Sequence, residues 1–135
     1  MDAFLGKWLL DRSRDKGEEA YLNMEGIPAD MAEKYKAGGV SLEISKQANN
    51  KYRYVHVCPG MPDTTNDFEL GQETLFEMAT GEKVKAKVSV DGDKIKESVC
   101  LHGVQMDSVK EIINGEMKSV TNSSNGELVQ YFKRI

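Results

Sequence analysis

The residues of this chain best suited to chemistry are its two histidines and two cysteines. His56 lies two residues before Cys58, and His102 lies two residues after Cys100. Residues two apart in a strand share a face, so each pair could place an imidazole beside a thiol and activate it. Neither pair has an evident third group to orient it, and the spacing does not match a metal site. We therefore expect no enzyme, metal or cofactor, and keep a Cys/His-dependent enzyme acting on a lipid as a minor alternative.

An amide near the end of the chain suggests a binding site instead. Residues 127–135 read ELVQYFKRI, in which Gln130 lies two residues from both Leu128 and Phe132. In a strand, this places the amide on the same face as two apolar side chains. The amide could bond to nearby backbone or internal water, or it could donate to or accept from an uncharged ligand group. The second interpretation predicts a polar contact for a ligand in an otherwise apolar interior.

The segments that must position these residues are β-strands. Apolar and polar residues alternate along 40–44, 52–57 and 83–90, which is the period of a strand. Tyr52, Tyr54 and His56 fall on one face of their segment. Turn signals separate such segments at intervals of about ten residues. We expect an all-β fold of eight to ten short strands that closes into a barrel, because closure removes unpaired edges.

One helical zone precedes the strands. Residues 16–25 predict a short helix that Gly26 can end. Ile27, Met31 and Tyr35 recur at steps of four and predict a second helix. Together they form a helix-turn-helix of about twenty residues, which is too short to be a domain.

Length and charge limit the classes of function. A chain of 135 residues is one domain, 1–135, that can bury about two thirds of its unfolded surface. A formal charge of -4 and a pI near 5.3 argue against nucleic acid as a partner. The chain has neither an apolar run long enough to span a membrane nor a signal-peptide pattern. We expect a cytoplasmic protein in which Cys58 and Cys100 are free thiols.

Five features stand in order over essentially the whole chain. They are Phe4-Leu5-Gly6-x-Trp8, the double helix, Phe68-x-Leu70-Gly71, Thr80-Gly81-Glu82-Lys83-Val84-Lys85 and Phe132-Lys133-Arg134. Together they resemble the intracellular lipid-binding proteins, the calycin branch of cytosolic fatty-acid-binding and cellular retinoid-binding proteins. The resemblance implies a ten-stranded antiparallel up-and-down β-barrel, a clamshell, with a short helix-turn-helix lid near the N-terminus. It also implies an internal cavity for one or two lipids, a monomeric carrier and no cofactor.

The resemblance also locates a candidate head-group site. Members with the usual fatty-acid site hold the carboxylate with an inward Arg and with an Arg-x-Tyr pair on the last strand. The matching positions here are Lys110, Gln130 and Phe132, so a point charge, an amide and a nonpolar ring replace those groups. We expect these three residues to contact the ligand. The remaining residues predicted to line the cavity are Tyr54, His56, Phe68 and Ile112.

The leading ligand is a long-chain fatty acid, because Lys110 offers a positive charge and fatty acids are the commonest cargo of the family. A retinoid, another neutral-headed lipid or a bile-acid-like molecule is the alternative, because Gln130 can bond an uncharged group. The resemblance implies that ligand enters between the second helix and the nearby turns at residues 58–64 and 76–81. We also expect transient membrane contact through Lys34 and Lys36, which Asp30 and Glu33 weaken. The predicted portal residues are Met31, Tyr35, Met61 and Phe76.

Overall fold

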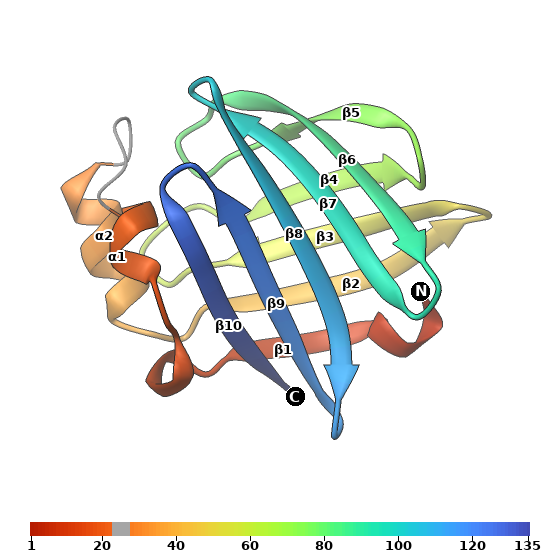
Figure 1. Ribbon diagram of the computed structural model, residues 1–135, viewed down its shortest axis with the longest axis horizontal. Helices are drawn as coiled ribbons and strands as arrows, with labels where there is room; N and C mark the ends of the chain where they lie inside the picture. Colours follow the sequence, from red (N-terminus) through yellow and green to blue (C-terminus); the bar gives the residue numbers. More distant parts are fainter. Residues whose placement is uncertain (23–27) are drawn as a thin grey trace.

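Ten antiparallel strands form one sheet that curls into a nearly closed barrel (Figure 1). The structure is a computed structural model and describes residues 1–22 and 28–135. The strands are β1 (Gly6–Leu10), β2 (Ser41–Ala48), β3 (Lys51–Val57), β4 (Thr64–Glu69), β5 (Glu73–Glu77), β6 (Lys83–Asp91), β7 (Lys94–Leu101), β8 (Val104–Ile113), β9 (Glu116–Ser123) and β10 (Gly126–Arg134). Their order in the sheet is β4-β3-β2-β1-β10-β9-β8-β7-β6-β5. The predicted ten-stranded clamshell is confirmed.

The strands follow from the alternation of apolar and polar residues. In β6, Val84, Ala86 and Val88 are buried, whereas the lysines between them are exposed. The turns follow from local chemistry as well. Asn114 and Gly115 connect β8 to β9 with φ angles of 53° and 78°, as a tight hairpin with both central residues left-handed requires.

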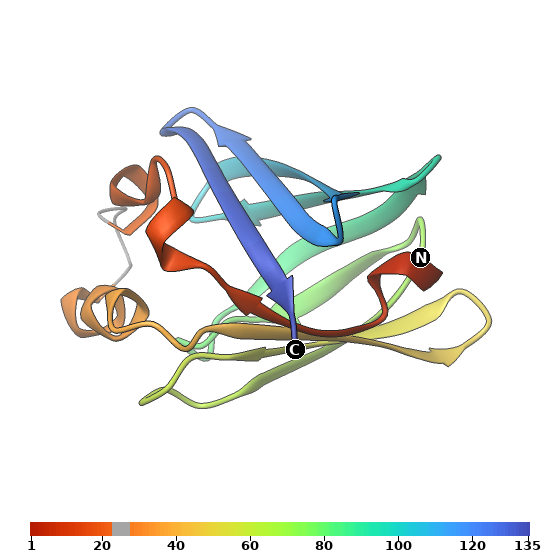
Figure 2. The same cartoon turned by 90° about the horizontal axis from the view of Figure 1, so that it is seen from below.

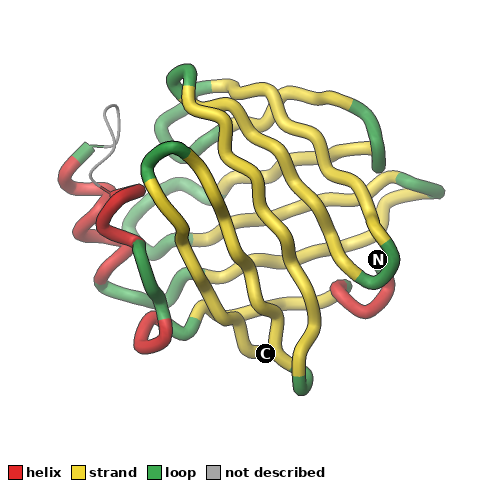
Figure 3. Tube along the Cα trace, viewed as in Figure 1, coloured by secondary structure: helices red, strands yellow, loops and turns green. Residues whose placement is uncertain are grey.

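Two short helices cover one end of the barrel (Figures 2 and 3). They are α1 (Glu18–Leu22) and α2 (Ala29–Lys36), and two 3-10 helices, η1 (Asp2–Phe4) and η2 (Arg12–Arg14), flank β1. The predicted second helix corresponds to α2, whose buried residue is Ala32. The predicted helix end at Gly26 and the place of Ile27 lie outside the described residues. Within the described ranges, no helix has the length and apolar character needed to cross a membrane.

A cluster of buried hydrophobic side chains from most of the strands forms the core of the barrel. Trp8 is fully buried, and its indole nitrogen donates a hydrogen bond to the carbonyl of Phe4 at 2.9 Å. The guanidinium of Arg134 lies over the indole, 4.2 Å from the ring centroid. Core residues with no more than 1% exposure also include Ile44, Val88, Ile95 and Met117.

One side chain bridges the seam between the edge strands β4 and β5. Asn66 is 7% exposed, and its Oδ1 accepts a hydrogen bond from the backbone nitrogen of Glu77 at 2.8 Å. Its Nδ2 donates to the carbonyl oxygen of Glu77 at 3.1 Å. The amide therefore supplies the two bonds that a neighbouring strand would otherwise make, and it holds the seam together.

Candidate functional site

The inner face of the barrel divides into a packed part and an accessible part. Cross-strand partners share a face, so the pairing register identifies the side chains that point inward. Trp8, Ile95 and Met117 belong to the packed part and have 0% exposure. Accessible surface on an inward-facing residue lies on the inner side of the barrel wall, where other side chains do not cover it. Inward-facing residues that keep such surface are His56, Val99, Met106, Ser108, Thr121, Leu128 and Gln130.

A polar cluster inside the barrel is centred on Glu97 of β7. Its Oε1 accepts a hydrogen bond from Nζ of Lys110 on β8 at 2.5 Å, and the two side chains are 11% and 10% exposed. Its Oε2 accepts a hydrogen bond from the hydroxyl of Tyr54 on β3. Since β3 and β7 are not neighbours in the sheet, this bond crosses the interior. The ring of His56 lies edge-on to Tyr54, with centroids 6.0 Å apart.

Burial and these contacts fix the protonation states in the cluster. Burial tends to raise the pKa of Glu97, but the charge of Lys110 and the bonds from Lys110 and Tyr54 outweigh it, so the pKa lies below its ordinary value. Burial and then the charge of Glu97 hold the pKa of Tyr54 well above its ordinary value. Burial and then the charge of Lys110 lower the pKa of His56 to about 4. At neutral pH the cluster is therefore an ion pair, a phenol and a neutral imidazole.

The side chain of His56 has accessible surface, yet its surroundings are not those of bulk water. By surface area it is an exposed residue, whereas removal from bulk water is the largest cause of its lowered pKa. A ring that faces enclosed space, rather than bulk water, explains both observations. Its cross-strand partner Leu42 on β2 is 2% exposed, so the ring is not on the outer surface.

A second polar network joins the last strand to the lid. The amide nitrogen of Gln130 donates to the hydroxyl of Tyr35 on α2 at 2.7 Å, and that hydroxyl donates to Asp15 at 2.8 Å. Arg12 pairs with the same carboxylate oxygen of Asp15 at 2.7 Å. Burial, the largest influence, holds the pKa of Asp15 above its ordinary value despite the hydrogen bonds from Arg12 and Tyr35. The predicted head-group contact Gln130 thus bonds directly to the predicted portal residue Tyr35.

The other residues predicted to contact ligand lie in two places. Phe68 is 4% exposed and packs against Tyr54, with ring centroids 4.6 Å apart and the planes at 63°. Phe132 is 6% exposed and pairs with Met117, so it lies toward the packed part, whereas Gln130 borders the accessible part. Ile112 also pairs with Met117 and is half-buried. Contact between any of these residues and a ligand stays a prediction.

The predicted portal residues differ in burial. Met31 and Met61 are half-buried, whereas Phe76 is 7% exposed and packs 5.9 Å from the ring of Phe68. A pocket of about 280 Å³ opens between the two turns that the resemblance identified. Residues 62–65 line one side of this pocket and residues 77–81 the other. The use of this region for ligand entry stays a prediction.

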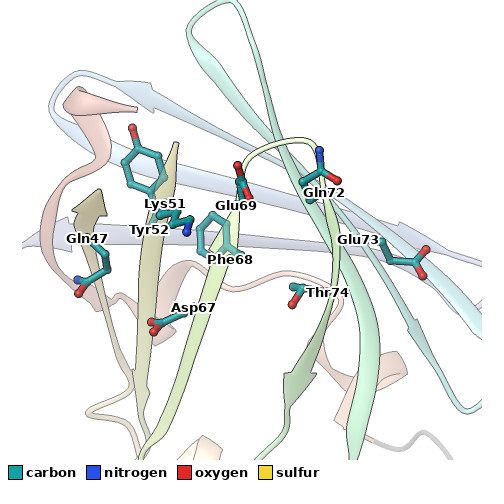
Figure 4. Close-up of a pocket in the computed structure, with 9 residues that line it drawn as sticks. All are labelled: Gln47, Lys51, Tyr52, Asp67, Phe68, Glu69, Gln72, Glu73 and Thr74. Atoms are coloured by element: carbon teal, nitrogen blue, oxygen red, sulfur yellow. The ribbon is translucent and has the colours of Figure 1, made fainter. Parts of the chain in front are cut away.

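A further pocket, of about 330 Å³, lies at the seam between β4 and β5 (Figure 4). Tyr52 and Phe68 line it together with charged side chains at the strand ends. One of these, Asp67, is already held by two hydrogen bonds from Arg53, at 2.6 and 3.0 Å. Most of the residues that line this pocket are charged or polar, so it suits a lipid tail less well than the barrel interior.

Neither Cys/His pair lies on a single strand, as the considered thiol activation would need, because a strand ends within each pair. β3 ends before Cys58, and β7 ends before His102, which has a positive φ of 52°. Burial also raises the pKa of the Cys58 thiol, which opposes its activation. The ring of His102 lies 2.7 Å from the carboxylate of Glu82, a contact that the sequence did not reveal. The thiol of Cys100 is exposed and takes no part in this contact. The described residues contain no group of three or more potential metal ligands.

The sequence reasoning missed two carboxylates, Glu97 and Asp15. Glu97 lies two residues from both Ile95 and Val99, the same signal of a polar residue on an apolar face that identified Gln130. Asp15 lies in a charged segment before α1, and no local pattern marks it as buried.

Comparison with known proteins identifies the family. Residues 2–133 match the model of a family described as lipocalin / cytosolic fatty-acid binding protein. The chain belongs to this family. It is a family of lipid carriers rather than enzymes, in agreement with the predicted resemblance and the predicted lack of catalysis.

Individual relatives agree with this assignment. The chain is 36% identical to fatty acid binding protein 1-B.1 of Danio rerio over 90 residues, 67% of each chain. It is 30% identical to gastrotropin of Oryctolagus cuniculus over 90 residues, 67% of this chain and 68% of the relative. A Schistosoma mansoni fatty acid binding protein solved with arachidonic acid has the same fold, with a TM-score of 0.87, 18% identity and coverage of 100% and 98%.

Proposed function

We propose that this chain carries a long-chain lipid, bound non-covalently in the accessible part of the barrel. The observation that carries this proposal is the inward-facing set that includes Val99, Met106 and Leu128, which keeps accessible surface on the inner face of the nearly closed barrel. Burying a hydrocarbon chain there yields about 0.8 kcal/mol per methylene, or roughly 10 kcal/mol for a long chain before association costs. The tail therefore supplies most of the affinity, and the head group sets specificity.

The names of the relatives support a fatty acid as the ligand. In that case Lys110 and Gln130 contact the carboxylate, and Phe132 and Ile112 line the interior beside it. Tyr54, His56 and Phe68 line the opposite wall. Met31, Tyr35, Met61 and Phe76 lie along the proposed route of entry.

A retinoid or another neutral-headed lipid is the second candidate, and one specific observation favours it. Lys110 already pairs with Glu97 at 2.5 Å, so its charge is balanced before any ligand arrives. A carboxylate entering the cluster would have to compete with Glu97 for the ammonium group. An alcohol or aldehyde carries no such requirement.

The same proposal treats residues 1–135 as one domain that acts as a cytoplasmic monomer. Transient contact with an anionic membrane through Lys34 and Lys36 is part of it. The ion pair between Lys34 and Asp30, at 3.8 Å, reduces the charge available for that contact.

The proposed function is tested by native mass spectrometry of protein purified without detergent, followed by extraction and identification of any small molecule that dissociates. A complex of the protein with lipid is the expected result. Delipidated protein should then bind either a fatty acid or retinol in a titration. If folded, delipidated protein binds no lipid of either kind, the proposed function is wrong.

A further inference from the structure

His56 presents an unused hydrogen-bonding group to the interior of the barrel. On β3 its ring faces the same side as Tyr54, which is 2% exposed, while the ring itself keeps accessible surface. The ring makes no hydrogen bond to any residue in the part of the chain that the structure describes. A neutral imidazole has one donor and one acceptor, so it can bind a hydroxyl, a carbonyl or an amide equally well.

The charged groups beside His56 cancel one another. Glu97 accepts hydrogen bonds from Lys110 and from the hydroxyl of Tyr54, so the carboxylate and the ammonium form a closed pair. A ligand carboxylate placed next to His56 would lie away from bulk water, beside an ammonium group that Glu97 already neutralises. An ionised carboxylate without a cation of its own is costly at such a site, unless it takes up a proton.

From this arrangement we infer that the barrel selects a long-chain lipid with an uncharged polar head group, an alcohol, aldehyde or primary amide, and that His56 binds that head group. This inference rests on the proposed carrier function and specifies the ligand class of the same site. Desolvation and the charge of Lys110, which keep the ring neutral at neutral pH, agree with it. Glu97 acts by occupying Lys110, so it excludes a carboxylate without touching the alcohol.

The first test compares two ligands that differ only in the head group. A saturated long-chain alcohol and the fatty acid of equal chain length each displace an uncharged fluorescent probe from delipidated protein at neutral pH. The alcohol should bind at least about tenfold more tightly than the acid, the factor that corresponds to one net hydrogen bond plus the avoided cost of burying an unpaired carboxylate. If the acid binds as tightly as the alcohol or more tightly, the inference is wrong, although the carrier function stands. If neither ligand binds to folded protein, the carrier function itself fails.

The second test replaces His56 and Glu97, the two side chains that set the preference for an uncharged head group. His56→Phe should weaken alcohol binding about three- to tenfold, whereas His56→Gln, which keeps an uncharged donor and acceptor, should retain it within about threefold. Glu97→Gln should free Lys110 and improve fatty acid binding by about tenfold or more. Equal alcohol affinity in both His56 variants would contradict the role of this ring.

Should Glu97→Gln fail to fold, the double variant Glu97→Gln/Lys110→Met supplies the charge test. That variant lacks both charges, so its acid affinity should stay within about threefold of the parent's. A loss of about tenfold or more would show that Lys110 holds the acid in the parent, and it would overturn the inference.

Discussion

Replacing Lys110 by methionine tests whether the buried ion pair between Glu97 and Lys110 stabilises the folded protein, as its geometry indicates. Glu97 and Lys110 are 2.5 Å apart and about nine-tenths buried. The substitution therefore leaves a carboxylate in the interior that, among the described residues, keeps only the hydroxyl of Tyr54 as a hydrogen-bond partner. Removing one member of such a pair costs about 3–5 kcal/mol. Because Tyr54 remains and Glu97 can take up a proton, we expect a loss near the lower end, about 3 kcal/mol.

The dependence on pH should change sign in this variant. In the parent, the pKa of Glu97 lies below its ordinary value, so its contribution is present above that value and disappears as the pH falls through the folded-state pKa. Without Lys110, burial remains the dominant influence and raises the pKa. The folded variant then binds more protons than the unfolded chain, and its stability should decrease as the pH rises from the ordinary glutamate value toward the raised one.

Urea unfolding of ligand-free protein, followed by the fluorescence of the buried Trp8 at several pH values, measures both effects. The matched control is Glu97→Gln/Lys110→Met, which removes both charges and should lie within about 1 kcal/mol of the parent. A loss below about 1 kcal/mol for Lys110→Met, with the pH slope of the parent unchanged, would refute the coupling.

Three further predictions follow from other parts of the fold. Trp8→Ala should destabilise the protein by about 3–5 kcal/mol in urea unfolding. The control Leu9→Ala, at a position that is 37% exposed, should change stability by less than about 1 kcal/mol. Similar losses in the two variants would contradict the burial of Trp8. Asn66→Ala should cost about 1–3 kcal/mol and speed hydrogen exchange of the Glu77 amide, and unchanged exchange would show that the bridge does not hold the seam. Because the pKa of His56 is lowered to about 4 in the folded protein, the protein should lose stability as the pH falls from the ordinary histidine pKa toward about 4. His56→Gln should flatten the pH dependence of stability in that window. An unaltered slope would argue against a desolvated ring.

Much of the fold could be predicted because it depends on local patterns. The alternation in residues 83–90 gives both the strand and its buried face, and Asn114-Gly115 gives the hairpin after β8. The inward orientation of Gln130 was likewise evident from its apolar neighbours two residues away. Patterns with a period of two report which face a residue occupies, and that information survives folding.

The partners of the site residues could not be predicted in the same way. Tyr54 meets Glu97 across the interior, and Gln130 meets Tyr35 from the lid, so both contacts depend on how distant elements come together. Lys110 shows the consequence most clearly. Its type suggested a free cation for a carboxylate, but the neighbouring strand supplies Glu97, which occupies that charge. Charge balance at a site is a property of tertiary structure.

The central claim is that the accessible part of the barrel holds a lipid, and methyl NMR of ¹³C-labelled protein titrated with a long-chain alcohol tests it most directly. The account predicts large shifts for the methyl groups of Val99, Met106 and Leu128, which border the interior space. It predicts small shifts for Ile95 and Met117, which are packed without accessible surface. No shifts, or shifts confined to methyl groups on the outer surface, would contradict the claim.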